Sequence, residues 1–321
     1  MASATSERAW LPTLSAAALA AMAAFWLLAT VSPAAGAGKP QLGFATSEQA
    51  VDALIAAVSS GSTAKLKQVL GPGSAPLVSS GDRVADKKAR EKFLAAYRAS
   101  NNLEKEGEDR ATLVVGTDGW TFPFPLVKLD GAWHFDSHAG AEEILDRRIG
   151  ANELNTIATC RAYVDAQQEY AEKDRNSDGF VEYAQHLLSS PGKRDGLYWP
   201  AAAGEEESPF GPLIADARAE GYGSSKRSGP SGPKPYHGYY YRILKGQGPA
   251  APGGAYDYVV NGHLVGGFAL VAFPARYGAS GVMTFIVSHA GVVYQKDLGA
   301  DTAEIAKKMT LFDPDPSWKP I

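Results

Sequence analysis

The sequence predicts an α+β protein in which helices pack on antiparallel sheets. Apolar residues recur at helical intervals over residues 50–58, which indicates a helix with one buried face. Short apolar runs separated by Asp-Gly pairs follow, and they are typical of antiparallel hairpins because glycine accepts the positive φ of a tight turn. A second series begins with a long helical stretch over about 152–173 and ends in glycine-punctuated strands. We therefore expect two α+β units, one after the other.

The N-terminus predicts a signal peptide. Arg8 precedes an apolar run over about 14–31, and Ala35 and Ala37 occupy the small-residue positions of an A-x-A cleavage site. We expect residues 1–37 to be removed and the protein to be periplasmic or secreted. The alternative is an uncleaved anchor, since the run approaches the roughly 20 residues that span a bilayer. No other long apolar segment occurs, so we expect no membrane span after cleavage.

Net charge and cysteine content limit the kinds of partner and the disulfide chemistry that we expect. The 321 residues carry a net charge of −4, which argues against a nucleic-acid partner because such a partner needs a basic face. Apolar residues make up 45% of the chain, enough to bury real cores. The single cysteine, Cys160, rules out an intramolecular disulfide. It falls on the apolar stripe of the long helix, so we expect it to pack in a core.

The first unit, residues 38–146, is predicted to place helices on a meander. Thr46 and Gln49 have capping-box spacing before the first helix, and Gly71 stops a second short helix. A third helix is expected near 86–98. The expected strands cover 112–115, 120–129 and 133–135, with turns at Asp118-Gly119 and Asp130-Gly131 and with Pro123 and Pro125 pushing the middle strand towards an edge or a bulge. This arrangement is similar to the cone-shaped fold of nuclear transport factor 2 relatives.

The second unit, residues 147–321, is predicted to place one long helix on an antiparallel sheet. A loop-rich middle follows the helix, and its Gly, Ser, Pro and Lys content near 204–235 indicates a mobile surface loop. The expected strands cover 239–244, 263–273, 282–287 and 292–295, with a last tight turn at 288–291. The whole chain is thus expected to hold a signal peptide and two α+β domains.

Several unusual strings resemble one family over essentially all of the mature chain. They include Ser80-Gly81-Asp82, Phe122-Pro123-Phe124-Pro125, Arg147-Arg148-Ile149-Gly150, Asp195-Gly196-Leu197-Tyr198-Trp199-Pro200, Gly253-Gly254-Ala255 and Asp297-Leu298-Gly299. The chain resembles the bacterial domain-of-unknown-function family 2950, with a departure at Ser137-His138, where that pattern has smaller or non-imidazole residues. The resemblance implies an exported protein without an assigned activity.

The second half also looks like the globular domain of type II secretion pseudopilins. The shared features are the Ala166-Gln167 and Tyr170 helix and the hairpin with Gly281-Val282 and Phe285. The resemblance implies a pilin-like domain. A pilin subunit needs a long apolar helix directly after its cleavage site, whereas Asp52 interrupts the segment that would serve. The pilin-like module is therefore internal and is not expected to polymerise through a membrane helix.

The best candidate site is a partial calcium loop. Asp174, Asn176 and Asp178 supply side-chain oxygens at loop positions 1, 3 and 5, and Gly179 follows at position 6 for the sharp turn. Glu182 stands at position 9, while position 12 holds a glutamine in place of the bidentate glutamate. The sequence predicts a calcium site at Asp174, Asn176, Asp178 and Glu182, and the alternative is a polar, Asx-rich turn at the end of a helix.

Two further groups are weaker candidates. His134, Asp136 and His138 would share one face of a strand and could bind zinc, or they form a solvated face. The aromatic residues could line a groove for a glycan or peptide, or pack across strands: Tyr198, Trp199, Tyr236, Tyr239, Tyr240 and Tyr241. The acidic run Glu205-Glu206-Glu207 is interpreted as a solvated loop.

Catalytic signatures are missing from the sequence. It has no Gly-x-Ser-x-Gly elbow, and no catalytic signature flanks Cys160. We therefore expect a non-enzymatic binding or scaffold protein with an envelope or extracellular partner and no cofactor. The alternatives are a calcium-stabilised binding module and a hydrolase that uses His134 and Asp136 or an unrecognised site.

Overall fold

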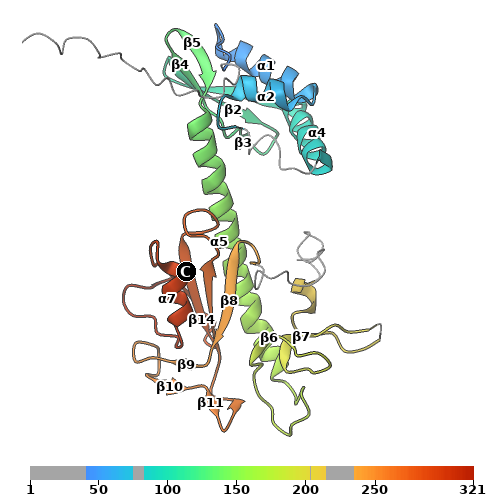
Figure 1. The fold of residues 1–321 in the computed structure, drawn as a ribbon, viewed down its shortest axis with the longest axis vertical. Coiled ribbons are helices and arrows are strands. Elements are labelled where there is room, and N and C mark those ends of the chain that lie inside the picture. Colours follow the sequence, from blue (N-terminus) through green and yellow to red (C-terminus); the bar gives the residue numbers. More distant parts are fainter. Residues whose placement is uncertain (1–40, 75–82, 203, 215–234) are drawn as a thin grey trace, which may run out of the picture. The chain divides into compact units, whose positions relative to one another are not determined.

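A computed structural model describes residues 41–74, 83–202, 204–214 and 235–321 (Figure 1). The predicted signal peptide at 1–37 lies outside these residues, and so does the larger part of the predicted loop at 204–235. Two hydrophobic cores form, one from residues between 50 and 135 and the other from residues between 160 and 318. Helices and antiparallel sheets contribute to both, which confirms the α+β class.

Among the described residues, three helices precede the first sheet, as predicted. They are α1 (Ser47–Ser59), α2 (Thr63–Leu70) and α4 (Arg83–Ala99). Thr46 caps α1, because its hydroxyl oxygen accepts a hydrogen bond from the Gln49 N–H at 3.2 Å. Gly71 ends α2 with a φ of 94°, a conformation that favours glycine. Leu54 and Leu66 are buried in the first core.

The first sheet has the strand order β1-β2-β4-β5, and β3 pairs with β2. Its strands are β1 (Asn101–Glu106), β2 (Arg110–Val115), β3 (Trp120–Thr121), β4 (Leu126–Leu129) and β5 (Ala132–Phe135). The turn at Asp130-Gly131 joins β4 to β5 as predicted, with both residues at positive φ. Alternate residues of β2, Ala111, Leu113 and Val115, are buried in the first core.

One expectation for this sheet was wrong, and one strand was missed. The predicted strand over 120–129 is interrupted between Thr121 and Leu126, because Pro123 and Pro125 have no N–H to donate to a ladder. Strand β1 was not predicted, since its sequence NNLEKE is polar and lacks an alternating pattern. It pairs with β2 along its whole length and leaves one edge unpaired within the described sheet.

Helix α5 (Ser137–Tyr170) contributes residues to the second core and packs Ile144 against the first. It begins at Ser137 rather than near 152, because the Asp136 carboxylate accepts hydrogen bonds from the His138 and Ala139 N–H groups and caps it there. It therefore runs through the expected domain boundary at 146. Ile144 packs against the first core, and Tyr163 lies in the second.

The second sheet is antiparallel, with the order β16-β15-β14-β13-β8. Its strands are β8 (Tyr239–Leu244), β13 (Ala269–Pro274), β14 (Met283–Ser288), β15 (Val293–Asp297) and β16 (Lys319–Pro320). Every residue of β13 is buried, and both α5 and α7 (Thr302–Lys308) contact this strand. The second core therefore forms between elements that are far apart in the sequence and meet only in the folded sheet.

In the described part of the chain, three small strand pairs accompany this sheet. They are β6 (His186–Leu188) with β7 (Gly196–Tyr198), β9 (Gly246–Gln247) with β10 (Tyr256–Asp257), and β11 (Val259–Val260) with β12 (His263–Leu264). The predicted strand over 263–273 is thus divided into β12 and β13. Gly266 and Gly267 separate the two, and Gly267 has a φ of 145°. No helix in the described parts of the chain is long and apolar enough to cross a membrane.

Candidate functional site

The predicted calcium loop begins just after α5 ends, and Asp174 closes its turn. The two carboxylate oxygens of Asp174 accept hydrogen bonds from the Ser177 N–H at 2.7 Å and the Gly179 N–H at 2.9 Å. Ser177 and Gly179 both adopt positive φ, at 62° and 92°, so the backbone turns sharply there. Asp174 therefore shapes the loop and directs its oxygens at the backbone.

Arg175 anchors the start of the loop to the end of α5. Its side chain is 3% exposed, and its guanidinium donates to the Glu169 carbonyl at 2.7 Å and to the Tyr170 carbonyl at 3.3 Å. The same guanidinium pairs with the Glu206 carboxylate. The buried guanidinium thus ties the start of the loop to the end of α5 and to Glu206.

Glu206 is part of a charge cluster, which corrects the expectation that Glu205-Glu206-Glu207 is a solvated acidic loop. Besides Arg175, it pairs with Lys173 at 2.8 Å and with Arg194 at 3.3 Å. The hydrogen bond from Lys173 and the nearby positive charges outweigh desolvation and hold the pKa of Glu206 below its ordinary value.

The remaining predicted ligands converge. The Asn176 amide nitrogen donates to the Asp178 carboxylate at 2.8 Å and to the Glu182 carboxylate at 2.9 Å. Glu182 is buried, and its second oxygen accepts the Leu264 N–H at 3.0 Å. Burial of a carboxylate is costly unless charge or hydrogen bonds compensate it. The structure therefore brings Asn176, Asp178 and Glu182 together, while Asp174 faces the backbone.

His263 completes this cluster from a distant part of the chain. Strands β11 and β12 form a hairpin whose turn residues, Asn261 and Gly262, both have positive φ. This hairpin places the His263 Nδ1 atom 3.4 Å from a Glu182 oxygen and 3.6 Å from an Asp178 oxygen. Donor atoms of the three residues all lie within 4.8 Å of one another. The His263 ring also stacks on Phe180, with the ring centroids 4.0 Å apart.

Sequence reasoning missed His263 because it lies about eighty positions after Glu182 and belongs to no local motif. The Asn-Gly pair before it is a hairpin signal that could have placed it at a strand start. Gln185, at loop position 12, connects the loop to the β11–β12 hairpin. Its side chain donates to the Gly262 carbonyl at 2.7 Å and accepts from Lys245 at 2.9 Å, so it ties the loop to the hairpin.

The carboxylate of Asp178 is held in its charged form. Desolvation acts to raise its pKa, but hydrogen bonds from the Phe180 N–H and the Asn176 amide, together with His263, outweigh it and lower the pKa. A cavity of about 220 Å³ opens onto the cluster, and Tyr170, His186 and Asp195 also line it. The arrangement can hold a cation between two carboxylates and one imidazole.

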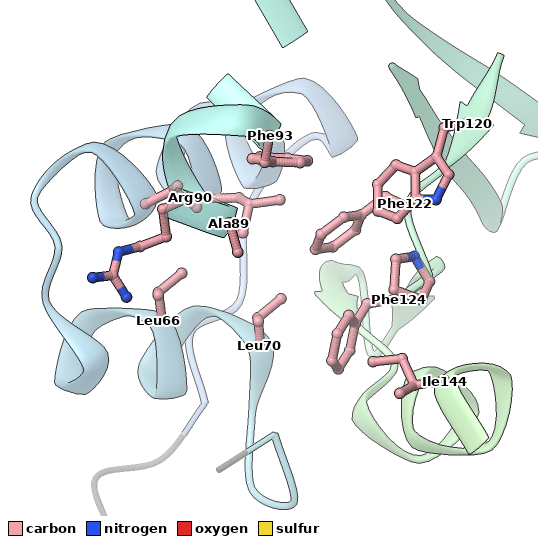
Figure 2. A pocket seen from close by; sticks show the side chains of 12 residues that line it. Leu66, Leu70, Ala89, Arg90, Phe93, Trp120, Phe122, Phe124 and Ile144 are labelled. Atoms are coloured by element: carbon pink, nitrogen blue, oxygen red, sulfur yellow. The ribbon is translucent and has the colours of Figure 1, made fainter. Parts of the chain in front are cut away.

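A second candidate is an apolar pocket of about 260 Å³ beside the first core (Figure 2). One side is formed by Leu66 and Leu70 of α2 with Ala89, Arg90 and Phe93 of α4, and the other by Trp120, Phe122, Phe124 and Ile144.

Ring contacts shape the aromatic side of the pocket. The centroids of Phe93 and Phe122 lie 5.5 Å apart, and those of Trp120 and Phe122 lie 6.2 Å apart. Trp120 remains 41% exposed, while the Arg90 guanidinium points away from the aromatic side chains (Figure 2). An apolar cavity with an exposed aromatic edge suits a small apolar molecule.

Comparison with known proteins gives a family. The model of the family described as protein of unknown function (DUF2950) matches residues 41–321. The chain belongs to this family. No curated protein and no solved structure matches the chain at a significant level. The DUF2950 resemblance is therefore confirmed, and the description of the family carries no activity. The pseudopilin resemblance receives no support from these comparisons.

The other groups predicted for this DUF2950 protein are placed as follows. Asp136 caps α5, and His138 lies in the first turn of that helix with its side chain 86% exposed. Of the three, only His134 lies on β5, so the expectation that they share one strand face was wrong. Cys160 is fully buried in the second core, as predicted, and burial raises the pKa of its thiol to about 12.

Most of the aromatic group contributes to packing. Trp199 and Tyr239 are buried in the second core, and Tyr198, Tyr240 and Tyr241 pack against it. The Tyr239 hydroxyl donates to the Met283 carbonyl at 2.9 Å. These contacts favour cross-strand packing over an aromatic groove for a glycan or peptide.

Proposed function

We propose that this DUF2950 protein is a non-enzymatic binding protein of the cell envelope that holds a small, uncharged apolar molecule. The observation that carries the proposal is the apolar pocket with Phe93, Trp120 and Phe122 on its walls. Its volume of about 260 Å³ exceeds the roughly 150 Å³ that accommodate benzene in a dry engineered cavity. It lies just below the roughly 300 Å³ at which pockets for drug-sized ligands begin.

Export and domain organisation are part of the same proposal. The apolar run over 14–31 and the Ala35-x-Ala37 site support secretion to the periplasm or the exterior, with an envelope or extracellular partner and no nucleic acid. Helices α1, α2 and α4 against the first sheet support a cone-like N-terminal domain over 38–146. Helix α5 against β13, β14 and β15 supports a pilin-like domain over 147–321.

Dye binding by matched variants tests the pocket. The uncharged dye N-phenyl-1-naphthylamine is titrated into the protein and its fluorescence is followed. Ala89 lines the pocket, so Ala89→Leu should fill it and weaken binding at least about tenfold by excluding the ligand volume. Ala95 lies on the same helix, is exposed and does not line the pocket, so Ala95→Leu should leave binding unchanged. Equal binding by both variants, or no binding by the wild type, would contradict the proposal.

A second candidate function is a calcium-stabilised binding module. It is favoured by one observation, the convergence of Asn176, Asp178 and Glu182 at the end of α5. With Asp174 they form the proposed calcium ligand set. Binding to the folded state alone raises the melting temperature, so thermal melts with millimolar calcium and with chelator test it. Identical melting temperatures in the two conditions would sink this candidate.

The hydrolase alternative gains no support from the geometry. It required His134 and Asp136 to converge with a positioned base in a pocket. Asp136 instead uses its carboxylate to cap α5, and the exposed His138 ring faces Glu142. We therefore keep the binding role as the proposed function.

A further inference from the structure

Two of the three donor–donor separations in the cluster of Asp178, Glu182 and His263 fit a small metal site. Donor atoms around a tetrahedral ion lie about 3.4 Å apart when the metal–ligand bonds are about 2.1 Å long. The His263 Nδ1 atom lies 3.4 Å from a Glu182 oxygen and 3.6 Å from an Asp178 oxygen. These separations are longer than hydrogen bonds and close to the edges of such a tetrahedron. The donors come from two elements, the loop after α5 and the β11–β12 hairpin, so the cluster is more than an acidic patch.

The chemistry of the donors selects the ion. Calcium takes six to eight oxygen ligands in most sites, at about 2.3–2.6 Å. Here Asp174 directs both oxygens at backbone N–H groups, and Asn176 presents its nitrogen to the two carboxylates. Few oxygens therefore remain for calcium. An imidazole nitrogen, by contrast, is a preferred ligand of zinc and of other first-row transition metals.

We propose that Asp178, Glu182 and His263 bind one divalent transition-metal ion of the zinc type. The inference rests on the proposed cation site and replaces its oxygen-only ligand set with a mixed nitrogen and oxygen set. The cavity of about 220 Å³ leaves a fourth position open to a water molecule or to a donor from a partner. The ion would join the loop after α5 to the β11–β12 hairpin.

Hydrogen bonds from the surroundings already orient the ligands. The Phe180 N–H donates to one Asp178 oxygen at 2.9 Å, and the Asn176 amide donates at 2.8 Å to the other, which lies 3.6 Å from His263 Nδ1. The Leu264 N–H and the Asn176 amide hold the buried Glu182 carboxylate. Such outer contacts fix ligand geometry and typically change metal affinity by about 10–100-fold when they are removed. The site is therefore built before the ion arrives.

Metal titration of the untagged, chelator-stripped protein tests the proposal. Zn²⁺ and Ca²⁺ are titrated by calorimetry, and Co²⁺ is added in parallel because its visible absorption reports tetrahedral nitrogen and oxygen coordination. We expect one Zn²⁺ per chain and a tetrahedral Co²⁺ spectrum. The variant His263→Gln should weaken Zn²⁺ binding at least about tenfold and remove the Co²⁺ spectrum. The variant His186→Gln removes an imidazole that lines the same cavity outside the cluster, so it should leave both unchanged.

Each other outcome overturns the inference in a distinguishable way. Calcium binding that is unaffected by His263→Gln would overturn the zinc-type assignment and leave the calcium-stabilised module standing. If none of the three ions binds, both assignments are overturned, and the contacts of His263 with Asp178 and Glu182 only join the loop to the β11–β12 hairpin. An equal loss of Zn²⁺ affinity in His263→Gln and His186→Gln would show that the ion binds imidazoles adventitiously. If His263→Gln fails to fold, the wild-type Co²⁺ spectrum decides, because an octahedral spectrum contradicts the proposed geometry.

Discussion

At the scale of single residues, Arg175 links the candidate loop to the end of α5 and to Glu206. A guanidinium that is almost completely buried requires partners for its N–H groups, and the Glu169 and Tyr170 carbonyls and the Glu206 carboxylate supply them. Position 2 of the loop is thus a structural anchor, while positions 5 and 9 face His263. Neighbouring residues in one short motif therefore have different tasks.

Replacing Arg175 should destabilise the protein more than replacing another partner of Glu206. Arg175→Met should lower the free energy of unfolding by about 2 kcal/mol, because charge-assisted hydrogen bonds contribute about 1.5–3 kcal/mol. Lys173→Met removes a side chain that is 56% exposed, so its cost should stay below about 1 kcal/mol. Urea unfolding measures both values. Equal costs would show that the buried contacts to the Glu169 and Tyr170 carbonyls contribute little.

Acid should weaken the same cluster. The hydrogen bond from Lys173 and the positive charges lower the pKa of Glu206 in the folded state. Its contribution to stability is therefore present above the ordinary glutamate pKa of about 4.3 and is lost as the pH falls through the lower, folded-state value. We expect the difference in unfolding free energy between the wild type and Glu206→Gln to shrink as the pH falls below about 4. Chelator in every sample excludes metal effects, and a difference that grows on acidification would contradict this sign.

At the scale of elements, α5 shows how one helix serves two cores. Its N-terminal end packs on the first core and its C-terminal part on the second. Gly140 lies where the helix meets the Phe124 ring, and a Cβ atom there would clash with that ring. Gly150 lies in the same helix, and a Cβ atom at this position would meet no other atom within 4 Å. Packing therefore requires a glycine at position 140 but not at position 150.

Alanine substitution should change the free energy of unfolding in opposite directions at these two glycines. Gly150→Ala should raise the free energy of unfolding by up to about 1 kcal/mol, because alanine restricts the unfolded chain and favours helix. Gly140→Ala should lower it by about 1–3 kcal/mol, since Phe124 is buried and must move. Thermal or urea unfolding of both variants provides the measurement. A stabilising Gly140→Ala would show that the Phe124 ring yields freely.

At the scale of the whole molecule, the two hydrophobic cores share no buried residue among those the structure describes. The first contains Leu54 of α1, and the second contains Ile286 in the middle of β14. The apolar pocket borders the first core, and the proposed metal ligands belong to the loop and hairpin near the second. Each proposed site therefore depends on a different part of the packing.

Cavity variants should affect the two cores separately. Leu54→Ala and Ile286→Ala should each cost about 2–5 kcal/mol, because each removes a fully buried side chain. In calorimetry we expect two thermal transitions. Leu54→Ala should lower the midpoint temperature of one, and Ile286→Ala should lower that of the other. Zinc should raise the midpoint temperature of only the transition that Ile286→Ala affects. A single transition that both variants shift equally would show that α5 makes the two cores unfold together.

Local sequence patterns determined the parts of this protein that short-range physics controls. The Thr46 cap, the helices α1 and α2, the Asp130-Gly131 turn and the buried Cys160 follow from capping, periodicity and turn chemistry. The partial loop from Asp174 to Glu182 was also visible, because its oxygens lie close together in the chain. Strand β1 was not, since it depends on pairing with β2 rather than on its own polar residues.

Only the tertiary structure decided the contacts between distant segments. Asp136 caps α5 and does not share a strand with His134 and His138, and the Asn261-Gly262 turn brings His263 to Asp178 and Glu182. The pocket likewise needs α2, α4 and the segment after β3 to meet. Such meetings depend on the packing of whole elements, in which each residue is positioned by neighbours far along the chain. A local pattern cannot contain that information, because spacing in the sequence does not determine separation in the fold.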